Sequence, residues 1–131
     1  MARALASAFD APLVFSTISR LVVDLNRSIG HPRLFSTPIR DSSAALRAEI
    51  VDRYYRPYRD EVEALVARFV ALGRRVIHVS SHSFTPELDG KVRRADVGLL
   101  YLPARRGEAT LCARWKGSLA AHAPDLQVRR N

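Results

Sequence analysis

The stretch VIHVSSHSFTPELDG, residues 76–90, changes from apolar sequence to two serines, a histidine and a turn. Its three β-branched residues, at positions 76, 77 and 79, favour a strand over residues 75–81. That strand would present His82, between two serines, at its carboxyl end. In open α/β sheets, sites form beyond the carboxyl ends of the strands. His82 is therefore the first candidate site residue.

A long helical pattern precedes this strand, from about residue 43 to residue 72. Four apolar residues there follow the i, i+3, i+4, i+7 spacing of one helix face: Val62, Leu65, Val66 and Phe69. Pro57 removes a backbone donor and clashes with the preceding turn, so we expect two helical pieces that meet at residues 55–57. Gly73 suits the residue that follows a helix end.

The rest of the chain continues the alternation of helices and strands. We expect helices over residues 2–9 and 108–121, and β segments over residues 13–15, 21–23, 97–101 and from 126 to 129. Residues 27–41 contain a glycine and two prolines and predict an irregular connection. Strands that alternate with long helices predict an α/β fold, with a mostly parallel sheet flanked by helices.

Size and composition predict one globular domain. The chain has 131 residues, of which 47% are hydrophobic and 26% charged, as is ordinary for a soluble protein. The single Cys112 cannot form an internal disulfide, which indicates a reducing compartment. No stretch approaches the roughly 18 apolar residues of a membrane span, and no signal-peptide pattern opens the chain. We therefore predict a cytoplasmic protein without membrane association.

The net charge of +8 raises the possibility of an acidic partner. The excess is nearly all arginine, in scattered pairs such as Arg74-Arg75 and Arg105-Arg106. Nucleic-acid recognition favours a clustered basic face with aromatic side chains between the charges. The scattered pattern argues against binding to nucleic acid. The alternative function is that of a non-catalytic basic module that binds an acidic partner.

Charged residues also surround a short apolar run in SRLVVDLNR, residues 19–27. Arg20 and Arg27 lie on either side of the run, with Asp24 and Asn26 near its end. Arginine offers planar paired donors, which suit a substrate carboxylate or a carbonyl that develops negative charge. Alternatively, Asp24 pairs with one of these arginines as part of the scaffold. The spacing alone leaves both interpretations open.

Other candidates have weaker patterns. The tyrosines of YYRPYRDEVE, residues 54–63, could line a pocket, but helical spacing favours the core. Cys112 is predicted to be a small buried residue. The serines beside His82 lack the glycine-flanked nucleophile elbow, so a serine or cysteine nucleophile is poorly supported. His82 itself is either a metal ligand, since neutral imidazole binds zinc well, or an ordinary side chain at a strand end. By elimination, metal-assisted chemistry is the catalytic mechanism that the sequence leaves open.

Five motifs together resemble those of a known family. SRLVVDLNRSIGHPRLFS, YYRPYR, SSHSFTPELDG, ADVGLLY and the final VRRN occur in this order in the N-formylglutamate amidohydrolase family, especially its bacterial branch. The resemblance covers essentially the whole chain. It implies a zinc-carboxypeptidase-like (phosphorylase/hydrolase-like) fold. It also implies hydrolysis of N-formyl-L-glutamate, or of a related N-acyl amino acid, to formate and L-glutamate.

The resemblance further implies roles for four residues. Arg20 matches the arginine that polarises the substrate carbonyl, and Asn26 and Arg27 match the pair that binds the substrate carboxylate. His82 matches a ligand of the catalytic Zn²⁺. The partner that these roles imply is a small-molecule N-acyl amino acid.

The chain also departs from the family pattern. Family members usually begin earlier, with a strand that carries the first zinc ligands, and continue past VRRN to a strand that ends in a glutamate base. Residues 1–131 are therefore expected to be a single partial domain whose other zinc ligands lie outside this chain. We expect impaired or absent activity and an incomplete sheet, whose exposed edges permit self-association or completion by another chain. Arg59 and Leu102 replace a frequent histidine and aspartate, so the substrate can differ too.

Overall fold

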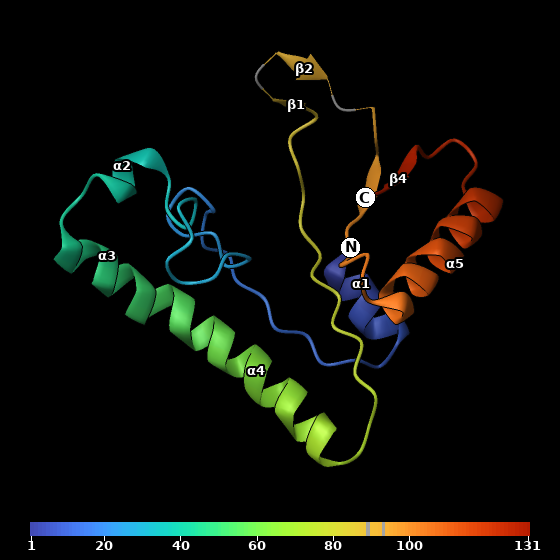
Figure 1. Ribbon diagram of the computed structural model, residues 1–131, viewed down its shortest axis with the longest axis horizontal. Coiled ribbons are helices and arrows are strands. Elements are labelled where there is room, and N and C mark those ends of the chain that lie inside the picture. Colours follow the sequence, from blue (N-terminus) through green and yellow to red (C-terminus); the bar gives the residue numbers. More distant parts are fainter. Residues whose placement is uncertain (89, 93) are drawn as a thin grey trace. The chain divides into compact units, whose positions relative to one another are not determined.

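The structure is a computed structural model that describes residues 1–88, 90–92 and 94–131. It is α/β, with helices and a small parallel sheet. Contacts divide the chain into two compact units, Met1–His82 and Ser83–Asn131. Figure 1 shows the helices of the first unit in blue to green and the strands of the second in yellow to red.

The first unit is helical, with long irregular connections. Its elements are α1 (Ala2–Ala8), α2 (Thr37–Arg40), α3 (Ala44–Ile50), the π-helical turn η1 (Val51–Tyr55) and α4 (Arg56–Ala71). The expected helix near the amino terminus and the long helical region are both confirmed. The expected irregular connection over residues 27–41 is interrupted at its end by the single turn of α2.

The two expected helical pieces meet where Pro57 predicts, because η1 ends at Tyr55 and α4 begins at Arg56. The helix widens at this junction into η1, and the Arg56 N–H bonds to the carbonyl of Val51, five residues back. In a regular α-turn the Pro57 ring would clash with the carbonyl of Arg53. A wider π turn relieves that clash, and Pro57 lies in the first turn of α4, where a missing N–H costs least.

Gly73 ends α4 as the sequence predicts. Its φ of 70° is left-handed, and its N–H donates to the carbonyl of Val70 at 2.9 Å. The Arg74 N–H donates to the carbonyl of Phe69 at 3.0 Å. These two bonds form a Schellman motif, which satisfies carbonyls that the helix end leaves without partners.

We expect Gly73→Ala to lower the free energy of unfolding by about 1 kcal/mol, because a β-carbon disfavours the left-handed conformation. Urea denaturation followed by circular dichroism measures this change. Gly117→Ala is the matched control. Gly117 lies inside a helix with open space around its α-carbon, so the control should be stabilising by roughly 0.5–1 kcal/mol. Equal effects of the two substitutions would contradict the Schellman motif at Gly73.

The core of the first unit packs an irregular loop against the junction of α3 and η1. Its buried members are Val23, Leu34, Ile50 and Tyr55. Val23 is completely buried. Because Val23 and Leu34 come from the loop and Ile50 and Tyr55 from the helix, this cluster fixes the loop on the helix. The preference of the YYRPYR tyrosines for the core is confirmed at Tyr55.

Three expected strands of the first unit are wrong. Residues 13–15, 21–23 and 75–81 form no strand in the part of the chain that the structure describes. Residues 19–23 turn instead, since the amides of Val22 and Val23 both bond to the carbonyl of Ser19. Local sequence favours an extended backbone, but a strand also needs a neighbour that pairs with its N–H and C=O groups.

The second unit contains the strands. It comprises a hairpin of β1 (Glu87–Leu88) and β2 (Lys91–Val92), followed by β3 (Val97–Leu99), α5 (Arg106–His122) and β4 (Val128–Arg130). The hairpin was not predicted. β3 and β4 are parallel, with Val97 opposite Val128, so the parallel pairing is confirmed for this βαβ unit.

The helix α5 covers β3 and β4 through a second small core. Its buried residues are Leu99, Cys112 and Val128, with Trp115 and Leu119 packed against them. Cys112 is thus the buried small residue that the sequence predicts. The Asn131 side chain extends the pairing, since it donates to the Tyr101 carbonyl at 2.7 Å and accepts from the Tyr101 N–H at 3.1 Å.

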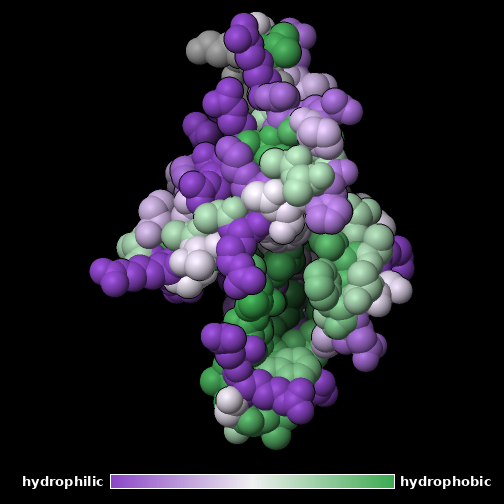
Figure 2. Space-filling view, turned by 90° about the vertical axis from the view of Figure 1, so that its right-hand side faces the viewer, coloured by the Kyte–Doolittle hydropathy of each residue, from purple (hydrophilic) through white to green (hydrophobic). Residues whose placement is uncertain are grey.

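Large apolar side chains are exposed in both units. Leu21, Leu72 and Ile77 of the first unit are more than half exposed, as are Val92 and Leu100 of the second. Figure 2 shows hydrophobic side chains in green at the surface among hydrophilic ones in purple. Within the described ranges, none of the helices combines the length and apolar character that a membrane span requires.

Candidate functional site

Asp24 is the centre of a charged cluster in the first unit. The residue is 6% exposed, and its Oδ2 lies 2.9 Å from Nη2 of Arg20 and 3.7 Å from Nε of Arg27. The arginine side chains are 54% and 41% exposed, respectively. One buried carboxylate therefore forms ion pairs with two half-exposed arginine side chains. The predicted pairing of Asp24 with one of these arginines is confirmed, and the second arginine also lies within ion-pair distance.

Asp24 also shapes the backbone that follows it. Its Oδ1 accepts a hydrogen bond from the Asn26 N–H at 3.1 Å, and its carbonyl accepts one from the Arg27 N–H at 2.9 Å. An aspartate that bonds the amide two residues on forms an Asx-turn. The Asp24 N–H donates to the Leu34 carbonyl at 2.8 Å. This turn fixes Asn26 and Arg27 beside the buried carboxylate.

The environment of Asp24 lowers the pKa of its carboxyl group. Burial opposes ionisation, but it is outweighed by the hydrogen bond from Arg20, the hydrogen bond from the Asn26 amide, and the charges of Arg20 and Arg27. Asp24 is therefore a carboxylate at neutral pH. With two guanidinium groups against one carboxylate, the cluster carries one excess positive charge.

Arg27 is held through its backbone as well. The Tyr55 hydroxyl, from the end of η1, donates to the Arg27 carbonyl at 2.7 Å. The Nε of Arg27 is buried and has no hydrogen-bond partner among the described residues. Because that atom is buried while the side chain is 41% exposed, the exposed surface belongs to other atoms of the side chain.

The segment that carries His82 lies beside Asn26. The Ser80 hydroxyl donates to Oδ1 of Asn26 at 2.9 Å, and His82 follows two residues later, a backbone reach of at most about 7 Å. His82 is exposed. The structure thus gathers Arg20, Asn26 and Arg27 on Asp24 and brings the segment of His82 alongside them.

A zinc site is not assembled by these residues alone. In the described part of the chain, no three histidine, cysteine or acidic side chains lie close enough to hold a metal ion. Catalytic zinc usually has three protein ligands and a water molecule. His82, with its imidazole, is chemically suited to be one such ligand, and the side chains that the structure describes do not complete a set with it.

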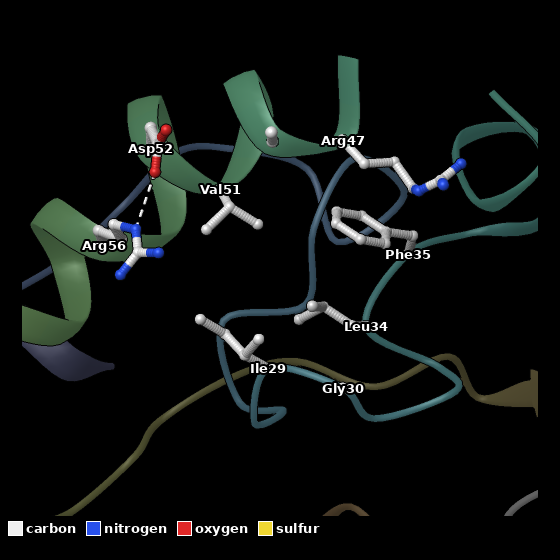
Figure 3. A pocket seen from close by; sticks show the side chains of 9 residues that line it. Ile29, Gly30, Leu34, Phe35, Arg47, Val51, Asp52 and Arg56 are labelled. Atoms are coloured by element: carbon white, nitrogen blue, oxygen red, sulfur yellow. Dashed lines mark hydrogen bonds and ion pairs between the residues drawn. The ribbon is translucent and has the colours of Figure 1, made fainter. Parts of the chain in front are cut away.

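A hollow of about 290 Å³ is lined by the loop that contains Leu34 and by residues of α3, η1 and the start of α4. Figure 3 shows Ile29 and Leu34 facing Val51 of η1 across it, with the Asp52–Arg56 ion pair at 2.8 Å on the helix. None of the four predicted site residues lines this hollow. We therefore place the candidate site at the Asp24 cluster, where the polar groups converge.

Tyr55 and Ser80 contact site residues but were not predicted as their partners. Both contacts join residues far apart in the sequence, 28 and 54 positions respectively, so no local pattern announces them. The sequence does contain a signal for the Asx-turn, because aspartate commonly bonds the amide two residues on. That signal would have favoured Asp24 as the centre of the cluster.

The fold and the cluster define an α/β protein in which two arginines pair with one buried carboxylate. The family described as N-formylglutamate amidohydrolase matches residues 1–131. The chain belongs to the N-formylglutamate amidohydrolase family, and the resemblance seen in the sequence is confirmed.

A solved structure is also similar to this chain. It is the crystal structure of a gene product from Agrobacterium tumefaciens, with a TM-score of 0.79 and 34% sequence identity. The similarity covers 99% of this chain and 52% of that one, so the chain spans about half the length of the solved protein. No curated protein matches the chain significantly.

Proposed function

We propose that this chain forms the substrate-binding part of a zinc-dependent amidohydrolase that converts N-formyl-L-glutamate, or a related N-acyl amino acid, into formate and L-glutamate. Family membership supports the reaction class. The observation that carries the proposal is the pair of half-exposed arginine side chains on the buried Asp24 carboxylate. One positive charge of this pair is not balanced by Asp24, and a substrate carboxylate would neutralise it.

The proposed roles follow from the chemistry of the side chains. Arg27 and Asn26, adjacent in the Asx-turn, bind the substrate carboxylate through N–H donors. Arg20 donates to the amide carbonyl oxygen and stabilises the negative charge that develops there. Asp24 keeps both arginines in place and carries no proton at neutral pH.

Zinc is part of the proposal, with His82 as one ligand and the remaining ligands outside residues 1–131. Such an ion, when bound, supplies Lewis acidity and a reactive water. We therefore propose that the 131-residue chain alone binds Zn²⁺ weakly and hydrolyses little. In the complete enzyme we propose a zinc-carboxypeptidase-like sheet in which residues 75–81 pair as a strand. Without those partners, the exposed apolar side chains favour self-association.

Ligand binding tests the proposed role of Arg27. We expect Arg27→Ala to weaken the affinity for N-formyl-L-glutamate about 10- to 100-fold, because charge-assisted hydrogen bonds contribute roughly 1.5–3 kcal/mol. Titration followed by NMR gives the dissociation constant. Arg33→Ala, which removes an exposed arginine of the same loop, should leave it unchanged. Equal affinities of all three proteins would refute the proposed carboxylate site.

A further inference from the structure

Tyr55 connects the core of the first unit to the candidate site. Tyr55 is 5% exposed and packs with Val23 and Leu34. Its hydroxyl donates to the Arg27 carbonyl at 2.7 Å. We infer that Tyr55 is a positioning residue for Arg27, and that the π-helical turn η1 places its hydroxyl there. The inference rests on the proposed role of Arg27 in binding the substrate carboxylate.

Both peptide groups of Arg27 are held. The N–H donates to the Asp24 carbonyl at 2.9 Å, and the carbonyl accepts from Tyr55. The Nε lies 3.7 Å from the Asp24 carboxylate. Asp24 and Tyr55 therefore fix the side chain's point of origin from two sides, so that the outer part of the guanidinium group reaches substrate from a defined position.

The π turn is needed for this arrangement. Ile50, the last residue of α3, and Tyr55 belong to the same core cluster. Residues five apart lie about 140° apart around a regular α-helix, at 100° per residue, and cannot both face one loop. In a π turn each N–H bonds to the carbonyl five residues back, which brings residues five apart onto the same side. The Arg56 N–H makes this bond to Val51.

Pro57 accounts for the position of the π turn. Its ring would clash with the Arg53 carbonyl in a regular α-turn. η1 ends at Tyr55, two residues before this proline. The sequence YYRPYR thus contains both the tyrosine and the proline that favours the π turn, which directs the tyrosine toward Arg27. In this way a helix far along the chain contacts the candidate site.

Tyr55→Phe tests the inference by removing the hydroxyl and keeping the ring. We expect the dissociation constant for N-formyl-L-glutamate to rise roughly fivefold to tenfold, in keeping with the loss of one hydrogen bond. The ¹³C signal of the Arg27 carbonyl and the exchange rate of its Nε proton should change at the same time. Tyr54→Phe is the matched control, because the Tyr54 hydroxyl makes no hydrogen bond within the described ranges, and both readouts should stay unchanged.

Two further variants separate positioning from stability. Ile50→Val weakens the same core but keeps the Tyr55 hydroxyl, and should leave the dissociation constant unchanged. Pro57→Ala keeps the hydroxyl but permits a regular α-turn, and should weaken binding as Tyr55→Phe does. Backbone amide exchange at residues 51–57 reports whether the π turn is lost.

The outcomes also distinguish this inference from the proposed function. If the unmodified chain binds no N-formyl-L-glutamate, the proposed function fails, and the NMR signals of Arg27 alone decide whether Tyr55 positions it. Unchanged Arg27 signals in Tyr55→Phe overturn the inference. So does an unchanged dissociation constant in that variant when the unmodified chain binds the ligand. If Tyr55→Phe does not fold, Pro57→Ala decides by the same readouts.

Discussion

Asp24→Ala should lower the free energy of unfolding by about 2–3 kcal/mol. Removing one partner of a fully buried ion pair typically costs roughly 3–5 kcal/mol, and the half-exposed arginines reduce that cost because water screens them. The substitution also removes the hydrogen bond to the Asn26 amide. Urea denaturation at pH 7 measures the change.

Asp41 supplies the control for this prediction. Its carboxylate lies 3.6 Å from Arg40, and both side chains are more than half exposed. Asp41→Ala should change stability by no more than about 0.5 kcal/mol. If Asp24→Ala unfolds at the same urea concentration as the unmodified chain, the cluster does not stabilise the loop and the account of it is wrong.

Acid should remove the contribution of Asp24. Its pKa in the folded state is below the value in the unfolded chain, so the unfolded state takes up the proton first as the pH falls. The stabilisation is complete above the unfolded pKa of about 3.9, and is lost as the pH falls through the lower folded pKa. Asp24→Asn should be less stable at pH 7 and should show a smaller loss of stability below pH 4.

Arg20→Ala should lower kcat for hydrolysis of N-formyl-L-glutamate by about 10²–10³-fold, the usual effect of removing one donor to a developing oxyanion. This is measured in a chimera that joins the chain to the part of the Agrobacterium relative that the chain does not cover, with Zn²⁺ present. The KM should change less than kcat, because the interaction is strongest in the transition state.

Arg20→Lys is the control for this substitution. Lysine keeps the positive charge opposite Asp24 and therefore most of the stability, but it loses the planar pair of donors. We expect a folded protein with a reduced kcat. A lysine variant with full activity would show that Arg20 supplies charge alone, and an alanine variant with full activity would remove Arg20 from the mechanism.

The helices could be predicted because their signals are local. The apolar stripe of α4 and the glycine that follows it lie within a few turns of one another. The π turn escaped prediction, although Pro57 marked the place, because the sequence shows that a regular helix is disturbed there but not how the backbone accommodates it.

The strands were predicted less accurately than the helices, because strand pairing depends on residues far apart in the sequence. β3 and β4 pair directly with each other, although α5 separates them in the sequence, and they follow the expected βαβ pattern. Residues 21–23 and 75–81 have the composition of strands, but the structure contains no ladder for them within its described ranges. Composition predicts that a segment can be extended, whereas its neighbours decide whether it becomes a strand.

The candidate site was predicted in part. Arg20, Asn26 and Arg27 were predicted as site residues from the sequence, and the structure brings them together around Asp24. The spacing alone did not decide whether Asp24 pairs with an arginine. Their catalytic roles, and ligation by His82, stay predictions. The contacts from Tyr55 and Ser80 could not be foreseen, because each depends on how distant segments fold against the loop.

We propose that the Asp24 cluster belongs to a zinc-dependent N-formylglutamate amidohydrolase. The most direct test is the release of formate from N-formyl-L-glutamate carrying ¹³C in the formyl group, followed by NMR in the chimera with one equivalent of Zn²⁺. We predict a growing formate signal that chelation or His82→Ala abolishes. A folded chimera that contains its full complement of zinc and releases no formate would contradict the account.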